Sequence, residues 1–264
     1  MGQLSGKVAI VTGASQGLGQ AYAIAFGEEG ASVVCAARNV DKLKETCAAV
    51  EAAGGRAVAI ACDVRELSDI EACVAKAVEA FGGIDIVVNN AQTIQHVFMN
   101  DASDQTMLDA LYSGPLASYR FMQASFPHMK ARGGGVIVNT GSPAQHLPVT
   151  ARYACYNAAK CGIEGLTRAA SDEWKDQGIY TFMVYPTAET AMTLGMKARD
   201  PERYAREVAH FPKGRMGDPL EDIGRPMVHL IVNAPRFTGK TISMNSKGVG
   251  EITEVIADVP FELP

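Results

Sequence analysis

The sequence lacks the features that mark several specialised classes of protein. The formal net charge is −5 and the pI about 5.6, so there is no basic footprint for nucleic acid or an anionic membrane surface. No apolar run approaches the roughly 20 residues that span a bilayer, and the first residues contain no apolar signal region. We therefore expect a cytoplasmic protein without a nucleic acid or membrane partner.

Patterns typical of disulfide frameworks and metal centres are also missing. No CxxC pair occurs among the six cysteines, which fall in predicted strands and helices: Cys35, Cys47, Cys62, Cys73, Cys155 and Cys161. Such placement is typical of buried thiols in a reducing compartment. The five histidines have no metal-ligand spacing, and the pair Glu221-Asp222 is interpreted as a helix cap or solvated face. The sequence predicts no metal site and no hydrolytic dyad.

What is present is an alternation of short apolar runs with longer helical stretches. Apolar residues make up 47% of the 264 residues, enough for one full core. Strands are predicted at 8–12, 32–36, 57–61, 84–88, 136–139 and 180–185, and helices at 17–30, 41–53, 68–81, about 105–131 and about 152–175. Strands that are apolar throughout favour a parallel sheet covered on both faces. We expect an α/β fold over residues 1–264, a single-domain doubly wound Rossmann-type parallel sheet with helices on both faces.

One segment stands apart from this alternation. Residues 190–215 are rich in Met, Lys, Arg and Glu, and they lie between Pro186 and the region of Gly214. This composition favours an inserted helical flap near a substrate, whereas a solvated surface helix is the alternative interpretation.

A glycine-rich loop follows the first predicted strand. It reads Thr12-Gly13-Ala-Ser-Gln-Gly17-Leu-Gly19 and leads directly into a helix. Glycines allow backbone N–H groups to approach a pyrophosphate, and the helix N-terminus adds partial positive charge. Because strand, loop and helix come in the required order, the loop predicts a dinucleotide site rather than a plain turn.

A tyrosine and a lysine four residues apart form the second motif. Tyr156 and Lys160 would lie on the same face of the helix predicted at 152–175, with Ser142 a short way upstream. A free phenol has a pKa of about 10, and a nearby positive charge favours its ionised form. Tyr153 is a competing tyrosine, but only Tyr156 has a lysine four residues later.

Several motifs in one order carry a resemblance: Gly13-x-x-x-Gly17-x-Gly19, Asp63-Val64, Asn89-Asn90-Ala91, Ser142 and Tyr156-x-x-x-Lys160. Over nearly its whole length the chain resembles the short-chain dehydrogenase/reductase family. The resemblance implies an NAD(P)-dependent oxidoreductase. Tyr156 would be the acid/base, Ser142 would orient the substrate oxygen, and Lys160 would bind the nicotinamide ribose and lower the pKa of Tyr156. The implied cofactor-binding residues are Gly13, Ser15, Gln16, Gly17, Leu18, Gly19, Arg38, Asp63, Val64, Asn90, Ala91, Tyr156, Lys160, Pro186 and Thr187, with Asn89 along the nicotinamide-side ribose.

The end of the second predicted strand bears on the choice of cofactor. Ala37 stands where NAD-preferring relatives usually carry Asp, and Arg38 follows it. Arginine attracts a ribose 2′-phosphate, whereas an acidic side chain repels it. NADP(H) is therefore favoured over NAD(H), although Gln16 occupies a position that is often basic in NADP-binding relatives. An ordinary surface charge is the alternative for Arg38.

The chain departs from the family pattern at four places. Leu111 stands where many relatives have a catalytic asparagine, so a proton relay would need another route, for example through Ser113. Gln92 replaces the glycine of Asn-Asn-Ala-Gly. Pro186 is followed by Thr187 instead of glycine, and Thr190 comes one residue early. Residues 244–248 differ in a region that contacts a neighbouring subunit in many relatives.

The substrate is predicted only as a class. Candidate pocket residues are mostly apolar: Ile94, Gln95, Pro143, His146, Leu147, Pro148, Tyr153, Tyr185, Met192, Leu194 and Met196. They favour a small apolar or alicyclic ketone or alcohol, whereas an acyl-carrier-linked substrate is less favoured. A regulatory nucleotide-binding protein with weak or lost catalysis is the alternative, and reduction of an imine or activated C=C bond remains open. The resemblance also implies a homodimer or homotetramer built on the helices at 105–131 and 152–175.

Overall fold

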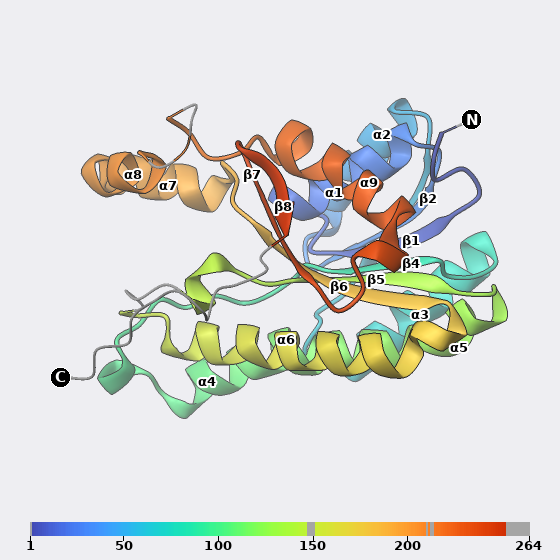
Figure 1. The fold of residues 1–264 in the computed structure, drawn as a ribbon, viewed down its shortest axis with the longest axis horizontal. Coiled ribbons are helices and arrows are strands. Elements are labelled where there is room, and N and C mark those ends of the chain that lie inside the picture. Colours follow the sequence, from blue (N-terminus) through green and yellow to red (C-terminus); the bar gives the residue numbers. More distant parts are fainter. Residues whose placement is uncertain (1, 147–150, 210, 212–213, 252–264) are drawn as a thin grey trace.

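An eight-stranded sheet forms the centre of the computed structural model, which describes residues 2–146, 151–209, 211 and 214–251 (Figure 1). The strands are β1 (Val8–Thr12), β2 (Ser32–Ala37), β3 (Arg56–Ala61), β4 (Ile86–Asn89), β5 (Gly135–Thr140), β6 (Ile179–Pro186), β7 (Thr241–Asn245) and β8 (Gly248–Glu251). Their order is β3-β2-β1-β4-β5-β6-β7-β8. All neighbours pair in parallel except β7 and β8, which are antiparallel. The strand order reverses between β1 and β4, where open α/β sheets bind ligands.

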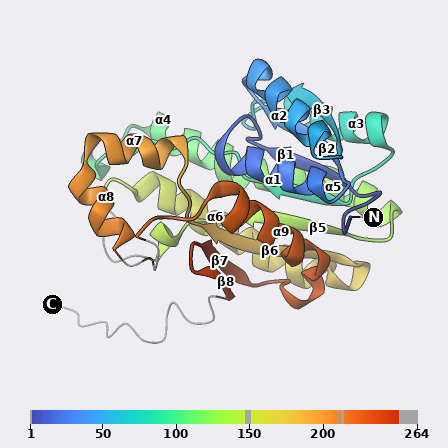
Figure 2. The ribbon, with the colours of Figure 1, turned by 90° about the horizontal axis from the view of Figure 1, so that it is seen from above.

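Helices cover both faces of the sheet. They are α1 (Gly17–Glu28), α2 (Val40–Ala52), α3 (Leu67–Phe81), α4 (Asp104–Leu111), α5 (Ala117–Ala131), α6 (Ala154–Trp174), α7 (Ala191–Arg199), α8 (Pro201–Val208) and α9 (Arg225–Val232). Figures 1 and 2 show α1, α2 and α9 on one face and α3, α5 and α6 on the other. The expected doubly wound architecture is therefore confirmed.

The alternation of side chains along β1 explains why its first four residues are all apolar. Ala9 and Val11 belong to the buried cluster beneath α1, α2 and α9, whereas Val8 and Ile10 belong to the cluster beneath α3 and α5. Successive residues of a strand point to opposite faces, so a strand with two covered faces needs an apolar residue at each position.

The helix predicted at about 105–131 is interrupted. A π-helical segment, Tyr112–Leu116, separates α4 from α5 and contains Pro115. Proline has no backbone N–H and crowds the preceding turn, and a widened turn accommodates both effects. The helical pattern of apolar residues continues through Tyr112–Leu116 without a break. The prediction of one uninterrupted helix at about 105–131 was therefore wrong at this segment.

The C-terminal part of the sheet was not predicted. The short strand β7 contains Ser243 and alternates buried with half-buried positions, and β8 contains two glycines. Neither resembles the apolar strands of the sheet centre. Between residues 190 and 215 the structure has two helices, α7 and α8, at one end of the molecule (Figure 1). Tyr204, Val208 and Met216 form a small buried cluster there, so α8 is not a fully solvated helix.

Two absences concern only the part of the chain that the structure describes. Within it, no helix is both long and apolar enough to cross a bilayer. Its histidines, cysteines and carboxylates form no group of three that could hold a metal ion.

Candidate active site

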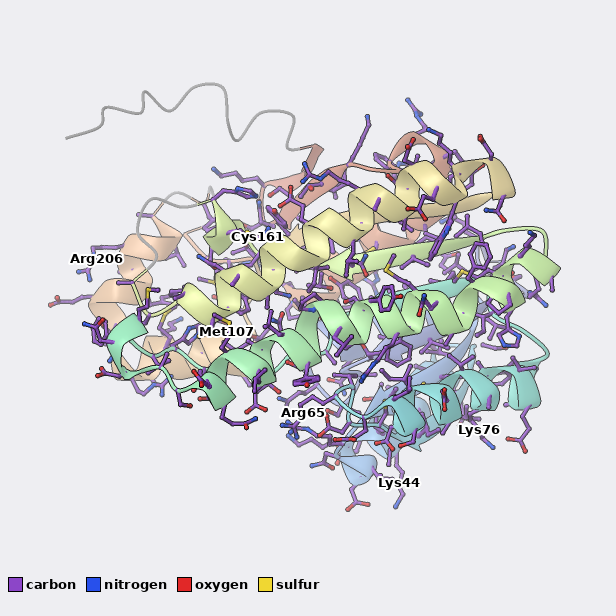
Figure 3. The ribbon with its side chains drawn as sticks, turned by 90° about the horizontal axis from the view of Figure 1, so that it is seen from below. Lys44, Arg65, Lys76, Met107, Cys161 and Arg206 are labelled. Atoms are coloured by element: carbon purple, nitrogen blue, oxygen red, sulfur yellow. The ribbon has the colours of Figure 1, made fainter. Side chains whose placement is uncertain are left out.

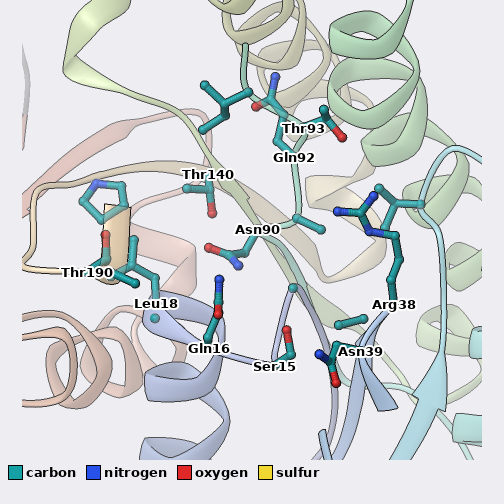
Figure 4. Close-up of a pocket in the computed structure, with 18 of the residues that line it drawn as sticks. Ser15, Gln16, Leu18, Arg38, Asn39, Asn90, Gln92, Thr93, Thr140 and Thr190 are labelled. Carbon is teal, nitrogen blue, oxygen red and sulfur yellow. The ribbon is translucent and has the colours of Figure 1, made fainter. Parts of the chain in front are cut away.

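A cavity of about 600 Å³ opens at the carboxyl ends of the parallel strands (Figure 4). Its lining residues are Gly13, Ser15, Gln16, Gly17, Leu18, Ala37, Arg38, Asn39, Lys42, Cys62, Asp63, Val64, Asn90, Ala91, Gln92, Thr93, Ile94, Thr140, Gly141, Ser142, Tyr156, Lys160, Pro186, Thr190 and Ala191. They follow six different strands, because parallel strands bring their carboxyl ends to one edge. Of the residues expected to contact cofactor, Gly19, Asn89 and Thr187 are not part of this lining.

The glycine loop lies close to the loop after β4. Gly13 and Gly17 have φ values of +68° and +59°, a conformation that L side chains rarely adopt. A Cβ atom at Gly13 would come within 2.8 Å of the Asn90 amide, and one at Gly19 within 2.3 Å of the Gly13 carbonyl oxygen. Gly19 therefore allows α1 to pack directly on the loop. This cradle, next to the N-terminus of α1, fits a pyrophosphate.

Thr12 joins the two loops. Its hydroxyl oxygen accepts hydrogen bonds from the backbone N–H groups of Asn90 (2.9 Å) and Ala91 (3.0 Å). The Asn90 side chain donates to the Thr12 carbonyl oxygen at 3.0 Å. Asn89 is instead buried, and its amide donates to the Asn139 side chain at 2.9 Å. Asn89 thus joins β4 to β5 and does not line the cavity, contrary to its expected place beside a ribose.

Positive side chains gather at one end of the cavity. Figure 4 shows Arg38 and Asn39 on the side opposite Thr190, with Ser15 and Gln16 between them. The Lys42 ammonium donates to the Gln16 side-chain oxygen at 2.9 Å. Sequence analysis did not identify Lys42 as a residue of this cavity. Its position in the first turn of α2, shortly after Arg38, could have indicated it.

At the same end of the cavity, the Asp63 carboxylate is paired with the side chain of Arg65. The carboxylate accepts hydrogen bonds from the Arg65 guanidinium, the shortest at 2.7 Å, and these bonds lower the pKa of Asp63. Arg65 also donates to Asp109 on α4 at 3.2 Å. Asp63 therefore stays ionised and is held at the cavity edge.

Tyr156 and Lys160 lie on one face of α6, as expected from their spacing. The Lys160 ammonium lies 5.5 Å from the centroid of the Tyr156 ring and donates to the carbonyl oxygen of Thr140. Lys160 is 4% exposed, and burial lowers its pKa to about 7. An ammonium group has three donors, so this buried group can also hold polar atoms of a ligand.

The pKa of Tyr156 is raised, not lowered as expected from its lysine neighbour. Burial is the largest cause, and the nearby Tyr153 adds to it. A hydrogen bond with Ser142 acts in the opposite direction. Desolvation disfavours the phenolate, and here it outweighs the favourable contacts. Ser142, Tyr156 and Lys160 are nevertheless together at one end of the cavity.

Several buried polar atoms in the cavity lining have no partner among the described residues. They are both amide atoms of Gln92 and the hydroxyl oxygens of Thr140 and Thr190. Unpaired buried polar groups are costly, so such atoms are suited to a polar ligand. Together with the glycine cradle, they fit a nicotinamide dinucleotide.

Ser113, the alternative relay residue, and Thr187, which stands in place of a glycine, both have specific contacts. The Ser113 hydroxyl accepts from the backbone N–H of Thr93 at 3.0 Å and donates to the Asp109 carbonyl oxygen at 2.6 Å. Ser113 thereby anchors the loop after β4 to the π-helical segment. Thr187 uses its backbone to pair with Met244, its N–H donating at 2.8 Å.

The substrate candidates are less uniform than the sequence suggested. Ile94 lines the cavity, whereas Tyr185 is buried and its hydroxyl lies 2.8 Å from the His146 ring nitrogen. Leu194 is 47% exposed. Leu147, Pro148 and the side chain of Met192 lie outside the described residues.

A family model for short-chain dehydrogenases matches residues 7–201. The chain belongs to the short-chain dehydrogenase/reductase family. It is accordingly an NAD(P)-dependent oxidoreductase.

Named relatives of this dehydrogenase/reductase cover most of its length. It is 34% identical to the 12α-hydroxysteroid dehydrogenase of a Clostridium species over 95% of this chain and 99% of the relative. It is 32% identical to the 2,5-dichloro-2,5-cyclohexadiene-1,4-diol dehydrogenase LinX of Sphingobium indicum, over 83% and 86%. Among solved structures, L-sorbose reductase from Gluconobacter frateurii, complexed with NADPH and L-sorbose, has a TM-score of 0.85 and 30% identity. The match covers 92% of this chain and 96% of that one.

Proposed function

We propose that this dehydrogenase/reductase interconverts a secondary alcohol and a ketone, with NADP(H) as the preferred cofactor. One observation carries the proposal: Ser142, Tyr156 and a buried Lys160 meet at one end of a cavity whose other end is basic. A nucleotide-binding protein without catalysis would need neither the serine nor the tyrosine.

The chemistry divides between cofactor and protein. In the reductive direction, bound NADPH supplies a hydride to the carbonyl carbon. Tyr156 donates its phenolic proton to the carbonyl oxygen, so that ketone, hydride and proton give the alcohol. The Ser142 hydroxyl holds the same oxygen against the phenol, and the Lys160 ammonium stabilises the resulting phenolate until it regains a proton. Acid–base catalysis of this kind contributes typically about 10²- to 10⁴-fold in rate.

The preference for NADP(H) rests on two cations, Arg38 and Lys42. Both lie at or just after the end of β2, the position at which an acidic residue would favour NAD(H), and both line the cavity. Gln16 is uncharged, but it accepts a hydrogen bond from Lys42 and so holds a cation beside the glycine loop. Two cations match the charge of a 2′-phosphate.

For the substrate we propose a small apolar or alicyclic ketone or alcohol. Among the described lining residues around Tyr156, Lys160 is the charged one, and Ile94 and Ala191 provide apolar surface. These described residues include no second cation to bind a carboxylate or phosphate of a substrate. The names of two relatives, a hydroxysteroid and a cyclohexadienediol dehydrogenase, refer to alicyclic alcohols. α7 and α8 would form the flap beside this substrate.

We also propose a homodimer or homotetramer that packs through α5 and α6, which run side by side in Figure 3. The outer face of α6 carries small exposed residues, Ala158, Cys161, Gly165 and Ala169. Tyr119 on α5 is 41% exposed. Small residues allow close approach of a second helix, and an exposed tyrosine supplies apolar contact area.

The six cysteines support a reducing compartment, the cytoplasm. All are free in the structure, although Cys35 contacts Cys47 and Cys62 contacts Cys73. In each pair the contact and burial raise the pKa of one thiol, Cys35 and Cys73 respectively, so these thiols stay protonated.

The decisive experiment is titration of the protein with NADPH and NADH by fluorescence, followed by consumption assays on cyclic and aromatic ketones. Tighter NADPH binding and ketone-dependent oxidation are expected. NADPH binding without turnover of any ketone would favour the regulatory alternative, and tighter NADH binding would contradict the cofactor assignment.

Tyr156→Phe separates catalysis from cofactor binding. Removal of the phenolic hydroxyl should lower kcat by about 10²-fold or more and leave cofactor binding almost intact. Tyr153→Phe is the matched control, because its ring lies 6.0 Å from that of Tyr156 but it has no lysine four residues later. An equal loss in both variants would contradict the assignment of Tyr156.

A further inference from the structure

The turn that carries Ser142 is organised around a glutamine. Ser142 precedes a 3₁₀ turn, Pro143–Gln145, and its hydroxyl oxygen accepts from the backbone N–H of Ala144 at 3.2 Å. The Gln145 side-chain oxygen accepts from the backbone N–H of Ser142 at 3.0 Å. This reciprocal pair is a capping box, which fixes Ser142 with respect to its own turn.

The other side of the Gln145 amide faces α6. Its nitrogen donates to the Glu164 carboxylate at 3.0 Å. The two partners settle the orientation of the amide, since a backbone N–H requires the oxygen and a carboxylate requires the nitrogen. Glu164 lies one helical turn after Lys160 and two after Tyr156, on the same helix. Through one amide, the backbone of Ser142 is therefore tied to the helix of its catalytic partners.

Three further contacts support this connection. Asn157, next to Tyr156, donates to the carbonyl oxygen of Ala144 at 3.0 Å, so the turn is attached to α6 at two points. The Glu164 carboxylate also lies 3.5 Å from the ring nitrogen of His146. That nitrogen is 2.8 Å from the hydroxyl of the buried Tyr185, on β6. Glu164 is thus held by the sheet as well as by the turn.

We propose that Gln145 and Glu164 are positioning residues that set the distance between the Ser142 hydroxyl and the Tyr156 phenol. The inference rests on the proposed alcohol–ketone chemistry and assigns to that site two residues that do not line the cavity. Without the amide, the turn keeps the Asn157 contact and the contacts of His146 with Glu164 and Tyr185, but no side chain ties the backbone N–H of Ser142 to α6. The hydroxyl would then leave the position from which it holds both the phenol and the substrate oxygen.

The test is a double-mutant cycle between Gln145→Ala and Ser142→Ala. In the native background, Gln145→Ala should lower kcat about 10- to 100-fold, the cost of a misplaced catalytic group, while the Kd for NADPH stays within about twofold. In the Ser142→Ala background the same substitution should have no further effect, because the group that it positions is absent. An equal loss in both backgrounds, or no loss in either, would overturn the proposal.

A reversed pair tests the geometry itself. In Gln145→Glu the new carboxylate faces Glu164, and kcat should fall. When Gln145→Glu is combined with Glu164→Gln, the amide at position 164 can donate to the carboxylate at position 145, so the hydrogen bond is restored in the opposite direction. Most of the activity should then return. Ser171→Ala is the matched control: it removes a side-chain hydrogen bond of α6, to the carbonyl oxygen of Arg168, away from the turn, and should leave kcat unchanged. Failure of the reversed pair to recover activity counts against positioning.

A readout without turnover separates this inference from the proposed function. The hydrogen bond with Ser142 lowers the pKa of Tyr156, so its loss should raise that pKa further. Ionisation of Tyr156 can be followed by ultraviolet absorption as the difference from Tyr156→Phe. If no ketone is reduced, the proposed function fails, but Gln145→Ala should still shift the titration in the same direction as Ser142→Ala. An unchanged titration would overturn the positioning role.

Discussion

Lys160 shows how far the surroundings can alter a single side chain. Exposed lysines are charged at neutral pH, but this one is enclosed by the sheet and α6 and donates to a backbone carbonyl oxygen. Burial disfavours its charged form and lowers its pKa to about 7. The buried, charged ammonium of Lys160 can be stabilised by polar atoms of a bound ligand. In the unliganded protein, its burial lowers the free energy of unfolding.

This cost predicts a pH dependence of stability. Below about pH 7 both folded and unfolded chains carry the proton on Lys160, and the penalty is constant. Between there and 10.5 the unfolded chain binds more protons, so stability rises with pH and the penalty disappears. Since one pKa unit corresponds to about 1.4 kcal/mol, Lys160→Met should stabilise the unliganded protein by at least that amount near pH 7. Melting temperatures of both proteins should converge toward pH 10.5; a constant difference would contradict the lowered pKa.

At the basic end of the cavity, Lys42 and Lys44 form a natural pair for comparison. Lys42 lines the cavity, whereas Lys44 is exposed and pairs with Asp41 at 2.9 Å. Lys42→Ala should weaken NADPH binding about 10- to 100-fold, the scale of one lost charged hydrogen bond, and leave NADH binding unchanged. Lys44→Ala should change neither. Fluorescence titration at low and high salt measures this, since a charge effect diminishes as salt is added. Equal weakening of both cofactors would exclude a contact with the 2′-phosphate.

At the scale of elements, α1 can pack closely on the glycine loop because Gly19 has no side chain. Gly19 is buried against the backbone of Gly13, so a methyl group there would displace the helix or the loop. Gly19→Ala should destabilise the protein by about 1–3 kcal/mol through overpacking and should weaken binding of both NADPH and NADH.

Gly195 is the matched control for this substitution. It lies within α7, and among the described residues a Cβ atom there would meet nothing nearer than the Arg199 side chain at 4.0 Å. Gly195→Ala should raise stability by about 0.5–1 kcal/mol, because alanine loses less conformational entropy in a helix. Urea unfolding of the two variants should give changes of opposite sign. A neutral Gly19→Ala would show that the loop can retreat from the helix.

At the scale of the whole molecule, the proposed assembly rests on the face of α6 that carries small residues. Gly165 lies in the middle of this face, and a Cβ atom added to it would have open space for 4 Å around it within the described part of the chain. Gly165→Trp should convert the proposed dimer or tetramer into smaller species. Ala48→Trp, at an exposed position of α2, should not. Sedimentation velocity measures both, and a native chain that sediments as a monomer would contradict the proposed assembly.

Much of the architecture could be predicted because its causes are local. β1 begins with its apolar run and extends one residue beyond it, to Thr12, and Tyr156 and Lys160 share a face of α6 because helical geometry requires it. The interruption at Pro115 and the strand β7 could not be predicted in this way. The π-helical turn lies against α6, where a Cβ atom at Gly162 would come within 3.2 Å of Pro115, and the short strand β7 depends on its pairing with both β6 and β8.

The alternation of strands and helices from β1 to β6, the position of the glycine loop and the identity of the candidate catalytic residues all follow from the amino-acid sequence alone. Each depends on spacing along the chain and on the conformations that each residue type allows. Three other properties require the folded chain: Lys42 stands beside Gln16, Gln145 joins Ser142 to Glu164, and burial raises the pKa of Tyr156. They come from through-space contacts and from the exclusion of water, which depend on segments that are distant in the sequence and that the fold brings together.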